Sequence, residues 1–226
     1  MRSPVSTVVF DVNETLSDLA PLRGRFTDVG ASADLAPLWF ASVLRDGFAL
    51  STCGQAAGFA DIGRAVLTSL LPETALNRPL GEAIDHVMEG FMSLDVHPDV
   101  PAGVAGLVEA GLRLVTLSNG STGVADALLT KAGLRDHFEA LLTVEDAGLW
   151  KPARSAYDYA ARFCGTEASQ MVLVAVHPWD LHGAHAAGMQ TAWINRAGTA
   201  YPEHFTRPDI EVTGLDEFPV ALSAGS

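Results

Sequence analysis

The sequence predicts an α/β fold in which a parallel sheet is covered by helices on both faces. Short apolar runs that end in polar residues alternate with Ala-rich stretches of helical length, and this alternation is typical of doubly wound sheets. One long stretch, residues 19–95, breaks the alternation because no strand is evident in it. At 226 residues the chain has room for a core and an inserted part. The fold class that follows is a Rossmann-like, doubly wound parallel sheet with an α-helical cap inserted after the first strand.

The predicted strands are short runs rich in Val, Leu, Ile and Thr. The first, residues 7–11, reads TVVFD and carries its only charge at its last position. An apolar run of this kind, without polar alternation, is expected of a strand that is buried on both faces of a sheet. The other five predicted strands are residues 112–118, 140–144, 171–176, 190–194 and 210–212.

The predicted helices of the core lie between these strands. Their apolar residues recur at three- and four-residue spacing, as in helices that pack one face on a sheet. They are residues 102–110, 123–132, 153–164 and 179–188.

The inserted stretch is predicted to be wholly helical, with segments at residues 35–48, 59–71 and 81–92 separated by Gly and Pro. A helical insertion after the first strand is expected to lie over the carboxyl ends of the strands, where open α/β sheets place their sites. The predicted organisation is therefore a catalytic core of residues 1–18 and 96–226 and a cap domain of residues 19–95.

Composition limits the classes of partner. With 14 Lys and Arg against 27 Asp and Glu, the formal charge is −13, so we expect no nucleic-acid partner, because binding to nucleic acid needs clustered cations. No apolar run approaches the roughly 20 residues that span a bilayer, so no membrane association is expected. Cys53 and Cys164 are far apart in sequence and form no metal-binding pattern. These features predict a protein of the reducing cytoplasm.

Polar residues gather where four predicted strands end. Asp11 follows the first strand, Ser118 ends the second, Lys151 follows the third and Asp180 follows the fourth. Each has an ordinary structural explanation, such as Asp180 capping the helix that follows. Because parallel strands deliver their carboxyl ends to one edge, the four together predict a single site.

These residues resemble the four motifs of the haloacid dehalogenase superfamily. The resemblance rests on the D-x-x-x-T segment from Asp11 to Thr15, on Ser118-Asn119, on the Lys151-Pro152 pair and on the acid after the fourth strand. The sequences LSNG, KP and WD are most similar to those of the L-2-haloacid dehalogenases, which cleave carbon–halogen bonds. The resemblance implies a small-molecule carboxylate substrate and a homodimer.

The resemblance implies a two-step reaction. Asp11 attacks the 2-carbon of the substrate and forms an ester, while Lys151 and Thr15 hold its carboxylate. Water then attacks the ester carbonyl, which needs a base and a partner for the developing oxyanion. Asp180 is expected to be the base and Lys151 the oxyanion partner, and His177 is a second residue able to orient water.

The substrate-binding residues are also implied by the family. Ser118 and the backbone N–H groups of Val12 and Asn13 are expected to bind the substrate carboxylate. Asn119 is expected at the leaving halide. Further expected contacts come from Tyr157, six residues beyond Lys151, and from Trp179 in the WD pair.

Three departures from the family pattern bear on the leaving group. Phosphatases of the superfamily have an acid two residues after the nucleophile, whereas this chain has Asn13, and a halide leaves without a proton. The arginine that dehalogenases carry after a cap tryptophan is replaced by Phe40 after Trp39, so that Arg45 becomes the candidate cap cation. In the last motif, Ala175 and His177 stand where Ser and Asn are usual.

No metal and no cofactor are expected, since a dehalogenase needs neither. Three alternatives remain: a Mg²⁺-dependent phosphatase of the same superfamily, a hydrolase of a non-halide electrophile, and a non-enzymatic binding module. A transition-metal site built from Asp180 and the nearby histidines is a less favoured possibility. The histidines concerned are His177, His182 and His185.

Overall fold

The sheet of the computed structural model, which describes residues 3–224, has six strands in the order β3-β2-β1-β4-β5-β6. Every neighbouring pair is parallel, and β1 lies in the centre. The predicted fold class is confirmed, and each predicted strand agrees with the structure to within one residue at either end. The strands are β1 Thr7–Phe10, β2 Arg113–Ser118, β3 Ala140–Thr143, β4 Met171–Ala175, β5 Gln190–Ile194 and β6 Ile210–Val212.

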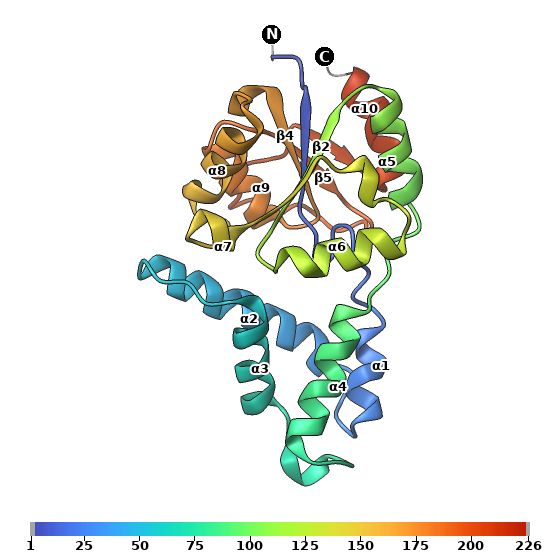
Figure 1. The fold of residues 1–226 in the computed structure, drawn as a ribbon, viewed down its shortest axis with the longest axis vertical. Helices are drawn as coiled ribbons and strands as arrows, with labels where there is room; N and C mark the ends of the chain where they lie inside the picture. The colour runs from blue at the N-terminus through green and yellow to red at the C-terminus, as the bar shows by residue number, and fades with distance from the viewer. Residues whose placement is uncertain (1–2, 225–226) are drawn as a thin grey trace.

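Helices cover both faces of this sheet (Figure 1). Successive side chains of a strand point to opposite faces, and in β1 Val9 belongs to one buried cluster while Val8 and Phe10 belong to the other. Helices α8 and α9 pack with the first cluster, and α5, α6 and α10 pack with the second. These helices are α5 Val100–Glu109, α6 Thr122–Lys131, α8 Arg154–Cys164, α9 Pro178–Ala186 and α10 Phe218–Ala224.

Four helices follow β1 and form a separate group below the sheet in Figure 1. Helix α2 runs four residues further than predicted, to Thr52, and the predicted ends of α3 and α4 agree to within one residue. The domain boundaries at residues 18/19 and 95/96 remain a prediction. The helices are α1 Leu22–Asp28, α2 Leu35–Thr52, α3 Phe59–Leu70 and α4 Leu80–Met92.

Aromatic side chains hold the cap helices together. Trp39 is fully buried and meets Phe59 and Phe91 edge-on, at ring-centroid distances of 6.2 and 5.6 Å. Its indole N–H donates to the carbonyl of Gly63 at 2.9 Å, so the one polar atom of the ring is satisfied. A side chain at Gly63 would lie 3.2 Å from the Trp39 ring. The close approach of α2 and α3 therefore depends on this glycine.

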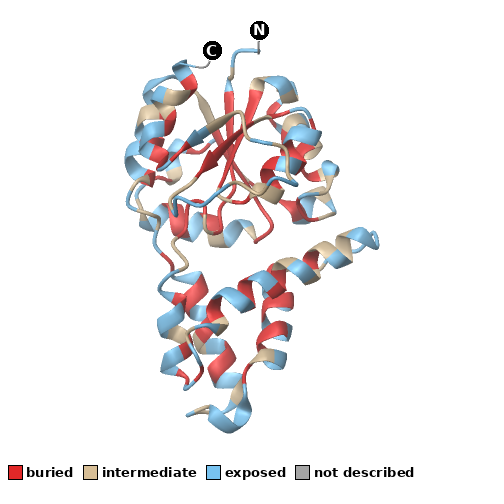
Figure 2. Cartoon of the chain, turned by 180° about the vertical axis from the view of Figure 1, so that it is seen from behind, coloured by how far each residue is buried: buried red, intermediate tan, exposed pale blue. Residues whose placement is uncertain are grey.

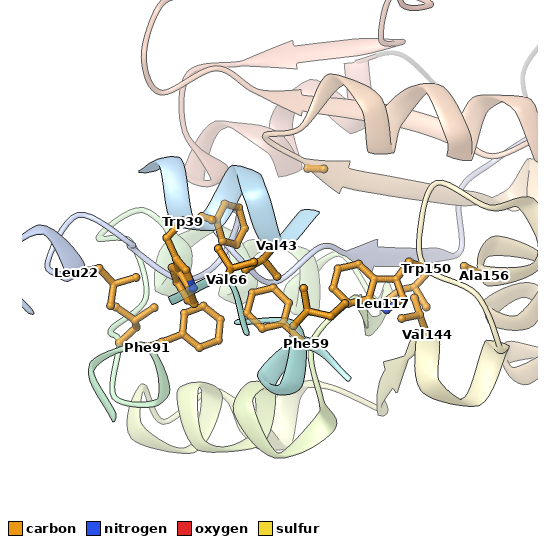
Figure 3. Packing of buried hydrophobic residues seen from close by; sticks show 14 of the residues in the cluster. Leu22, Trp39, Val43, Phe59, Val66, Phe91, Leu117, Val144, Trp150 and Ala156 are labelled. Atoms are coloured by element: carbon orange, nitrogen blue, oxygen red, sulfur yellow. The ribbon is translucent and has the colours of Figure 1, made fainter. Parts of the chain in front are cut away.

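The same aromatic row continues from the cap into the core (Figure 3). The ring of Phe59 stacks on Trp150, with centroids 5.9 Å apart and planes 8° apart. Trp150 also donates its backbone N–H to Ser51 Oγ at 3.0 Å and its indole N–H to the carbonyl of Ala57 at 3.1 Å. Trp150 precedes Lys151, so a residue held by the cap adjoins a predicted site residue.

Short elements are where the structure differs from the prediction. The predicted third strand included Val144, which instead begins helix α7, Val144–Ala147, because the Thr143 side chain accepts from the Glu145 N–H and caps a helical turn. Helices α1 and α10 were not predicted. Helix α1 buries Leu22 and Phe26, and α10 buries Phe218 and Leu222. Figure 2 shows the sheet buried beneath helices of the core. Four 3₁₀ turns were also not predicted: Glu73–Ala75, Arg135–His137, Ala168–Gln170 and Leu215–Glu217.

Candidate active site

The carboxyl edge of the sheet brings the predicted polar residues together. Asp11 directly follows β1, and Ser118 is the last residue of the neighbouring β2. Lys151 follows α7, while His177 and Asp180 lie at the start of α9, directly after β4. Because β4 and β2 flank β1 in the sheet, residues after all three strands surround Asp11.

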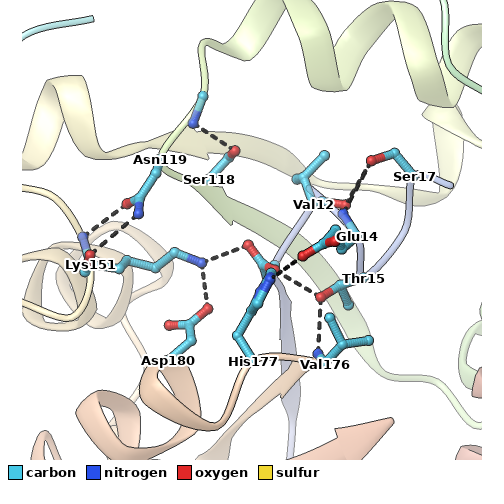
Figure 4. Close-up of polar contacts among 12 residues, drawn as sticks. Val12, Glu14, Thr15, Ser17, Ser118, Asn119, Lys151, Val176, His177 and Asp180 are labelled. Atoms are coloured by element: carbon cyan, nitrogen blue, oxygen red, sulfur yellow. Dashed lines mark hydrogen bonds and ion pairs between the residues drawn. The ribbon is translucent and has the colours of Figure 1, made fainter. Parts of the chain in front are cut away.

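The Asp11 carboxylate is 4% exposed and accepts three side-chain hydrogen bonds (Figure 4). Its Oδ1 accepts from Lys151 Nζ at 2.9 Å. Its Oδ2 accepts from Thr15 Oγ1 at 2.7 Å and lies 2.9 Å from His177 Nδ1. The two oxygens therefore face two different groups of residues.

The first group, which we call the buried flank, consists of Lys151, Asp180 and Tyr157. Lys151 and Asp180 have no exposed surface, and Lys151 Nζ also donates to Asp180 Oδ2 at 2.6 Å. The Tyr157 hydroxyl donates to Asp180 Oδ1 at 2.6 Å. One ammonium thus joins two carboxylates in a region without solvent-exposed surface, and the tyrosine fixes the second carboxylate.

Charge pairing sets the ionisation of the buried flank. Burial alone would raise the pKa of the Asp11 carboxyl, but the Lys151 charge and the hydrogen bonds hold that pKa well below its usual range. Burial would lower the pKa of Lys151, but Asp11 and Asp180 raise it. For Asp180, burial raises the pKa, and the neighbouring Asp11 charge adds to this despite Lys151. Asp180 is consequently a better proton acceptor than an ordinary aspartate.

The second group, which we call the cleft flank, consists of Thr15, His177 and Glu14. Thr15 Oγ1 accepts from the backbone N–H of Val176 at 3.1 Å, which leaves its proton for Asp11. The His177 ring lies between two carboxylates, with Nδ1 facing Asp11 and Nε2 lying 2.8 Å from Glu14 Oε2. Burial lowers the pKa of His177, but the hydrogen bonds to Asp11 and Glu14 outweigh it and raise that pKa to about 9.

Glu14 is a site residue that the sequence did not reveal. Its backbone has φ of 62°, a conformation that is uncommon for a residue with a side chain. Three contacts fix it: the N–H donates to Ser17 Oγ at 3.3 Å, and the carbonyl accepts from Arg196 Nη1 at 3.4 Å and lies 3.0 Å from His97 Nε2. The signal that points to Glu14 is its place between Asp11 and Thr15, but only the turn geometry directs its carboxylate at His177.

A cleft of about 430 Å³ opens beside the cleft flank. Glu14 and His177 line it together with Phe40, whereas Asp11 does not. The side chain of Glu14 is 42% exposed and that of His177 is 11% exposed. The imidazole therefore stands between the nucleophile and this opening, and other lining residues include Asp18, Arg23, His97 and Arg196.

Residues of the second motif lie close to the cluster. Phe10 pairs with Thr116 in the sheet, so Ser118 lies level with Val12, and both are buried. Ser118 Oγ accepts from the Gly120 N–H at 2.9 Å. Asn13 is buried in the turn after β1, where it forms a bridge with Ser17.

Asn119 contacts the backbone of Lys151. Its Oδ1 accepts from the Lys151 N–H at 2.9 Å, and its Nδ2 donates to the Lys151 carbonyl at 3.3 Å. A pair of bonds to one residue fixes the direction in which the Lys151 side chain leaves the backbone. The geometry thus gives Asn119 a positioning contact with the lysine, in addition to the halide contact predicted for it.

The structure separates the predicted cap residues. The Phe40 ring lies 6.2 Å from the His177 ring, and the Trp179 ring stacks on His177 at 5.0 Å. Arg45 is different: its side chain is 70% exposed and pairs with the adjacent Asp46 at 2.8 Å. Phe40 occupies the inward face of α2 and Arg45 its outer face, so the structure does not bring Arg45 to the other site residues, and its contact with the substrate stays a prediction.

A hard cation does not fit between Asp11 and Asp180, because the Lys151 ammonium already bonds to both carboxylates. Within residues 3–224, no group of three His, Cys, Asp or Glu side chains is placed to hold a metal ion. His182, one of the histidines considered for a metal site, contacts Thr206 instead, at 3.1 Å.

None of the helices within residues 3–224 combines the length and the apolar character that a membrane span requires.

Comparisons with known proteins agree with this geometry. The family model for haloacid dehalogenase-like hydrolases matches residues 5–188. The chain is 30% identical to (S)-2-haloacid dehalogenase of Pseudomonas sp. strain YL, over 93% of this chain and 91% of the relative. It is 29% identical to haloacetate dehalogenase H-2 of Moraxella sp. strain B, over 94% of this chain and 95% of the relative. A crystal structure of a dehalogenase with an intermediate complex has a TM-score of 0.88 and 28% identity, and the match covers 96% of this chain and 97% of that one. The resemblance seen in the four motifs is thereby confirmed, and the chain belongs to the haloacid dehalogenase-like hydrolase family.

Proposed function

We propose that this protein is a hydrolase that displaces halide from the 2-carbon of a small carboxylic acid and produces a 2-hydroxy acid. The observation that carries the proposal is the buried flank: Lys151 bonds to both Asp11 and Asp180 with no exposed surface. The named activities of the two relatives, an (S)-2-haloacid dehalogenase and a haloacetate dehalogenase, support the same substrate class.

In the first step Asp11 acts as the nucleophile. Its depressed pKa keeps it ionised, and the hydrogen bonds from Lys151 and Thr15 fix its orientation. Burial removes the water that would otherwise solvate the carboxylate, which makes the anion more reactive towards carbon. The product of this step is an ester between Asp11 and the 2-carbon, with the halide released.

In the second step water attacks the ester carbonyl, and Asp180 is the base. Two residues near the ester are able to orient water, but His177 presents ring N–H groups to Asp11 and Glu14, and a protonated imidazole has no free lone pair. Asp180 keeps an acceptor carboxylate, and burial raises its pKa. Tyr157 holds that carboxylate in place at 2.6 Å.

Asn13 supports a halide as the leaving group. It occupies the position at which superfamily phosphatases have their acid, and a carboxamide has no proton to give to a leaving alcohol. A halide is weakly basic and leaves without one. The substrate carboxylate is then bound by the Ser118 hydroxyl and by the backbone N–H groups of Val12 and Asn13, with Phe40 and Trp179 as apolar walls.

Halide release from a panel of substrates tests the activity. We expect release from 2-chloropropionate and from at least one of fluoro-, chloro- and bromoacetate, without added metal and unaffected by EDTA. Release from none of these compounds would reject the dehalogenase proposal. Metal-dependent hydrolysis of a phosphate ester would favour the phosphatase alternative.

A single turnover in H₂¹⁸O tests the covalent route. With enzyme in excess, hydrolysis at the aspartyl carbonyl places the label in the peptide that contains Asp11. Direct attack of water on the 2-carbon places it in the hydroxy acid. Turnover that leaves Asp11 unlabelled would contradict the ester mechanism.

We further propose three features of the working protein: a core of residues 1–18 and 96–226 with a cap of residues 19–95, a cytoplasmic location, and a homodimer. The grouping of α1–α4 supports the first (Figure 1), and the free thiols of Cys53 and Cys164 support the second. The homodimer rests on the family resemblance. Light scattering during gel filtration checks it, and a monomer mass would reject it.

A further inference from the structure

We propose that the two oxygens of Asp11 have separate and fixed roles: Oδ1 attacks the substrate, and Oδ2 stays in an oxyanion site made by Thr15 and His177, with Glu14 as the positioning residue for His177. This inference rests on the proposed dehalogenase function. It gives the cleft flank the oxyanion role that the family resemblance implies for Lys151, and it adds Glu14 to the residues that act in ester hydrolysis.

The hydrogen bonds around Asp11 distinguish its two oxygens. A carboxylate oxygen has two lone-pair directions in its plane. On Oδ2 both are used among the described residues, by Thr15 Oγ1 at 2.7 Å and by His177 Nδ1 at 2.9 Å. Among the same described residues, Oδ1 accepts from Lys151 alone, at 2.9 Å. An attacking oxygen needs a free lone pair directed at carbon, and only Oδ1 retains one.

The chemistry of the first step follows from this difference. A lone pair of Oδ1 forms the bond to the 2-carbon, and the carbon–halogen bond breaks with its electron pair going to the halide. The Asp11 carboxylate thereby becomes an ester in which Oδ1 is the bridging oxygen and Oδ2 the carbonyl oxygen. The two donors on Oδ2 are retained.

The second step places negative charge on Oδ2. Water bonds to Cγ of Asp11 and gives one proton to Asp180, while the carbonyl electron pair moves to Oδ2. When the intermediate collapses, Oδ1 leaves with the substrate carbon and takes the proton from Asp180. Loss of the remaining water proton restores the Asp11 carboxylate, so each turnover consumes one water and releases one halide and one proton.

The geometry at Oδ2 meets the requirement for an oxyanion site. Donors that stabilise such an intermediate lie about 2.7–3.1 Å from the oxygen that becomes charged. Thr15 Oγ1 and His177 Nδ1 lie at 2.7 and 2.9 Å. The site exists before the reaction, because Thr15 is itself fixed by the Val176 N–H at 3.1 Å.

Glu14 keeps His177 in the form that donates. Both ring nitrogens of His177 face carboxylate oxygens, so both must carry protons to make attractive contacts. Glu14 supplies the second carboxylate from a backbone fixed by Ser17, His97 and Arg196. The charged and titratable groups around the imidazole are Asp11, Glu14, Lys151 and Asp180 at the cluster, and Asp18, Arg23, His97 and Arg196 along the cleft.

Many turnovers in H₂¹⁸O, with substrate in large excess, test the fixed roles. Each turnover carries the Oδ1 atom away in the product and replaces it with an oxygen from water, while the Oδ2 atom stays. We therefore expect the Asp11 peptide of the wild-type protein to contain one ¹⁸O atom and never two. Two labels would mean that the Asp11 carboxylate rotates between turnovers, so that either oxygen is able to attack. That result would overturn the inference.

A variant at His177 tests whether this residue keeps Oδ2 of Asp11 in place. In H177A, run to the same number of turnovers, Oδ2 has lost one donor, so we expect a second label in Asp11 and a kcat that is about 10²–10³-fold lower. A single label in H177A would overturn the role of His177. Circular dichroism checks that the variant is folded, and E14Q, which keeps the imidazole, provides the second test if it is not.

E14Q tests positioning and has a matched control. We expect kcat to fall more than KM changes, and the alkaline limb of the kcat profile, which in the wild type follows the His177 pKa of about 9, to move to lower pH. E139Q is the control, because Glu139 is 45% exposed, close to the 42% of Glu14, and pairs with Arg113 away from the site. An unmoved limb in E14Q, or an equal shift in E139Q, would overturn the role of Glu14.

The same experiment separates the two proposals. If Asp11 contains no label after many turnovers and the product carries it from the first turnover, the covalent mechanism of the proposed function fails. If Asp11 contains two labels, that mechanism stands and only the fixed roles of its oxygens fail.

Discussion

The two flanks of Asp11 differ in how deeply their residues are buried and in how readily these residues are predicted from the sequence. The buried flank has no exposed surface at Lys151 or Asp180, and these two residues belong to recognisable sequence motifs. The cleft flank borders an opening of about 430 Å³, and one of its members, Glu14, is 42% exposed. The first flank holds an ion pair whose desolvation requires complete pairing. The second holds a histidine whose charge depends on groups that meet solvent.

Because of this difference, the two flanks control different properties of the reaction. A buried ammonium between two carboxylates keeps its charge throughout the ordinary pH range, so the buried flank sets whether the reaction occurs at all. The cleft flank titrates closer to neutrality, so it sets the pH range of activity. The following tests act on one flank at a time.

Removing the lysine should have the largest effect. K151M leaves Asp11 and Asp180 buried without their shared cation, and breaking a buried pair in this way costs about 3–5 kcal/mol in the free energy of unfolding. Denaturant titration at neutral pH measures it. R113M is the control, since Arg113 and Glu139 form a half-exposed pair worth about 0–1 kcal/mol. Equal losses in the two variants would remove the distinction between buried and exposed pairs here.

Alkaline pH should act on the cleft flank. The pKa of His177 is raised from 6.5 to about 9 in the folded protein, so its stabilising contribution is complete below pH 6.5 and is lost as pH rises through 9. We expect the free energy of unfolding to fall by about 3 kcal/mol over this window. E14Q should show a smaller fall, measured by denaturant titration at a series of pH values. An equal decline in E14Q would contradict the contribution of Glu14.

Loss of the Tyr157 hydroxyl should lower the free energy of unfolding less than loss of the Lys151 ammonium does. Y157F removes a 2.6 Å hydrogen bond to the Asp180 carboxylate, and hydrogen bonds to charged groups contribute about 1.5–3 kcal/mol. Y159F is the matched control, because its hydroxyl makes a 3.4 Å contact with Asp146 at the surface. Thermal unfolding compares the two, and a Tm loss in Y159F as large as that in Y157F would contradict the argument.

Arg45 lies outside both flanks and should matter least. R45A removes a side chain that is 70% exposed and pairs with the neighbouring Asp46, so we expect a change in stability within about 0.5 kcal/mol and unchanged halide release. Steady-state kinetics checks the second point. A large rise in KM would mean that Arg45 reaches the substrate after all, as the sequence first indicated.

Much of the buried flank was predictable because its residues follow strands. Asp11, Lys151 and Asp180 each come after an apolar run, and parallel strands end at one edge of a sheet. Helix periodicity likewise predicted α2, α3 and α4 of the cap, whereas α1 was not predicted. Short elements such as α7 were not predictable in this way, because one turn of helix has too few residues to show a period.

The cleft flank was harder to predict because it depends on turns. The positive φ of Glu14 decides whether its side chain faces solvent or His177. This backbone conformation is held by Ser17, which is three residues away, and by His97 and Arg196, which are far away in sequence. The difference between the place expected for Arg45 and the place it has in the structure arises in a similar way. Its sequence position leaves open which face of α2 points inward, and the burial of Phe40 decides that question.

The contact between Trp150 and the cap has a mechanical consequence. The indole of Trp150 is held by Phe59 and Ala57 of the cap, and its backbone continues directly into Lys151. We expect any separation of the cap from the core to pull the lysine out of its place between Asp11 and Asp180. In an open molecule the Asp11 carboxylate would then lack its ion pair with Lys151, and closure over a substrate would restore that pair.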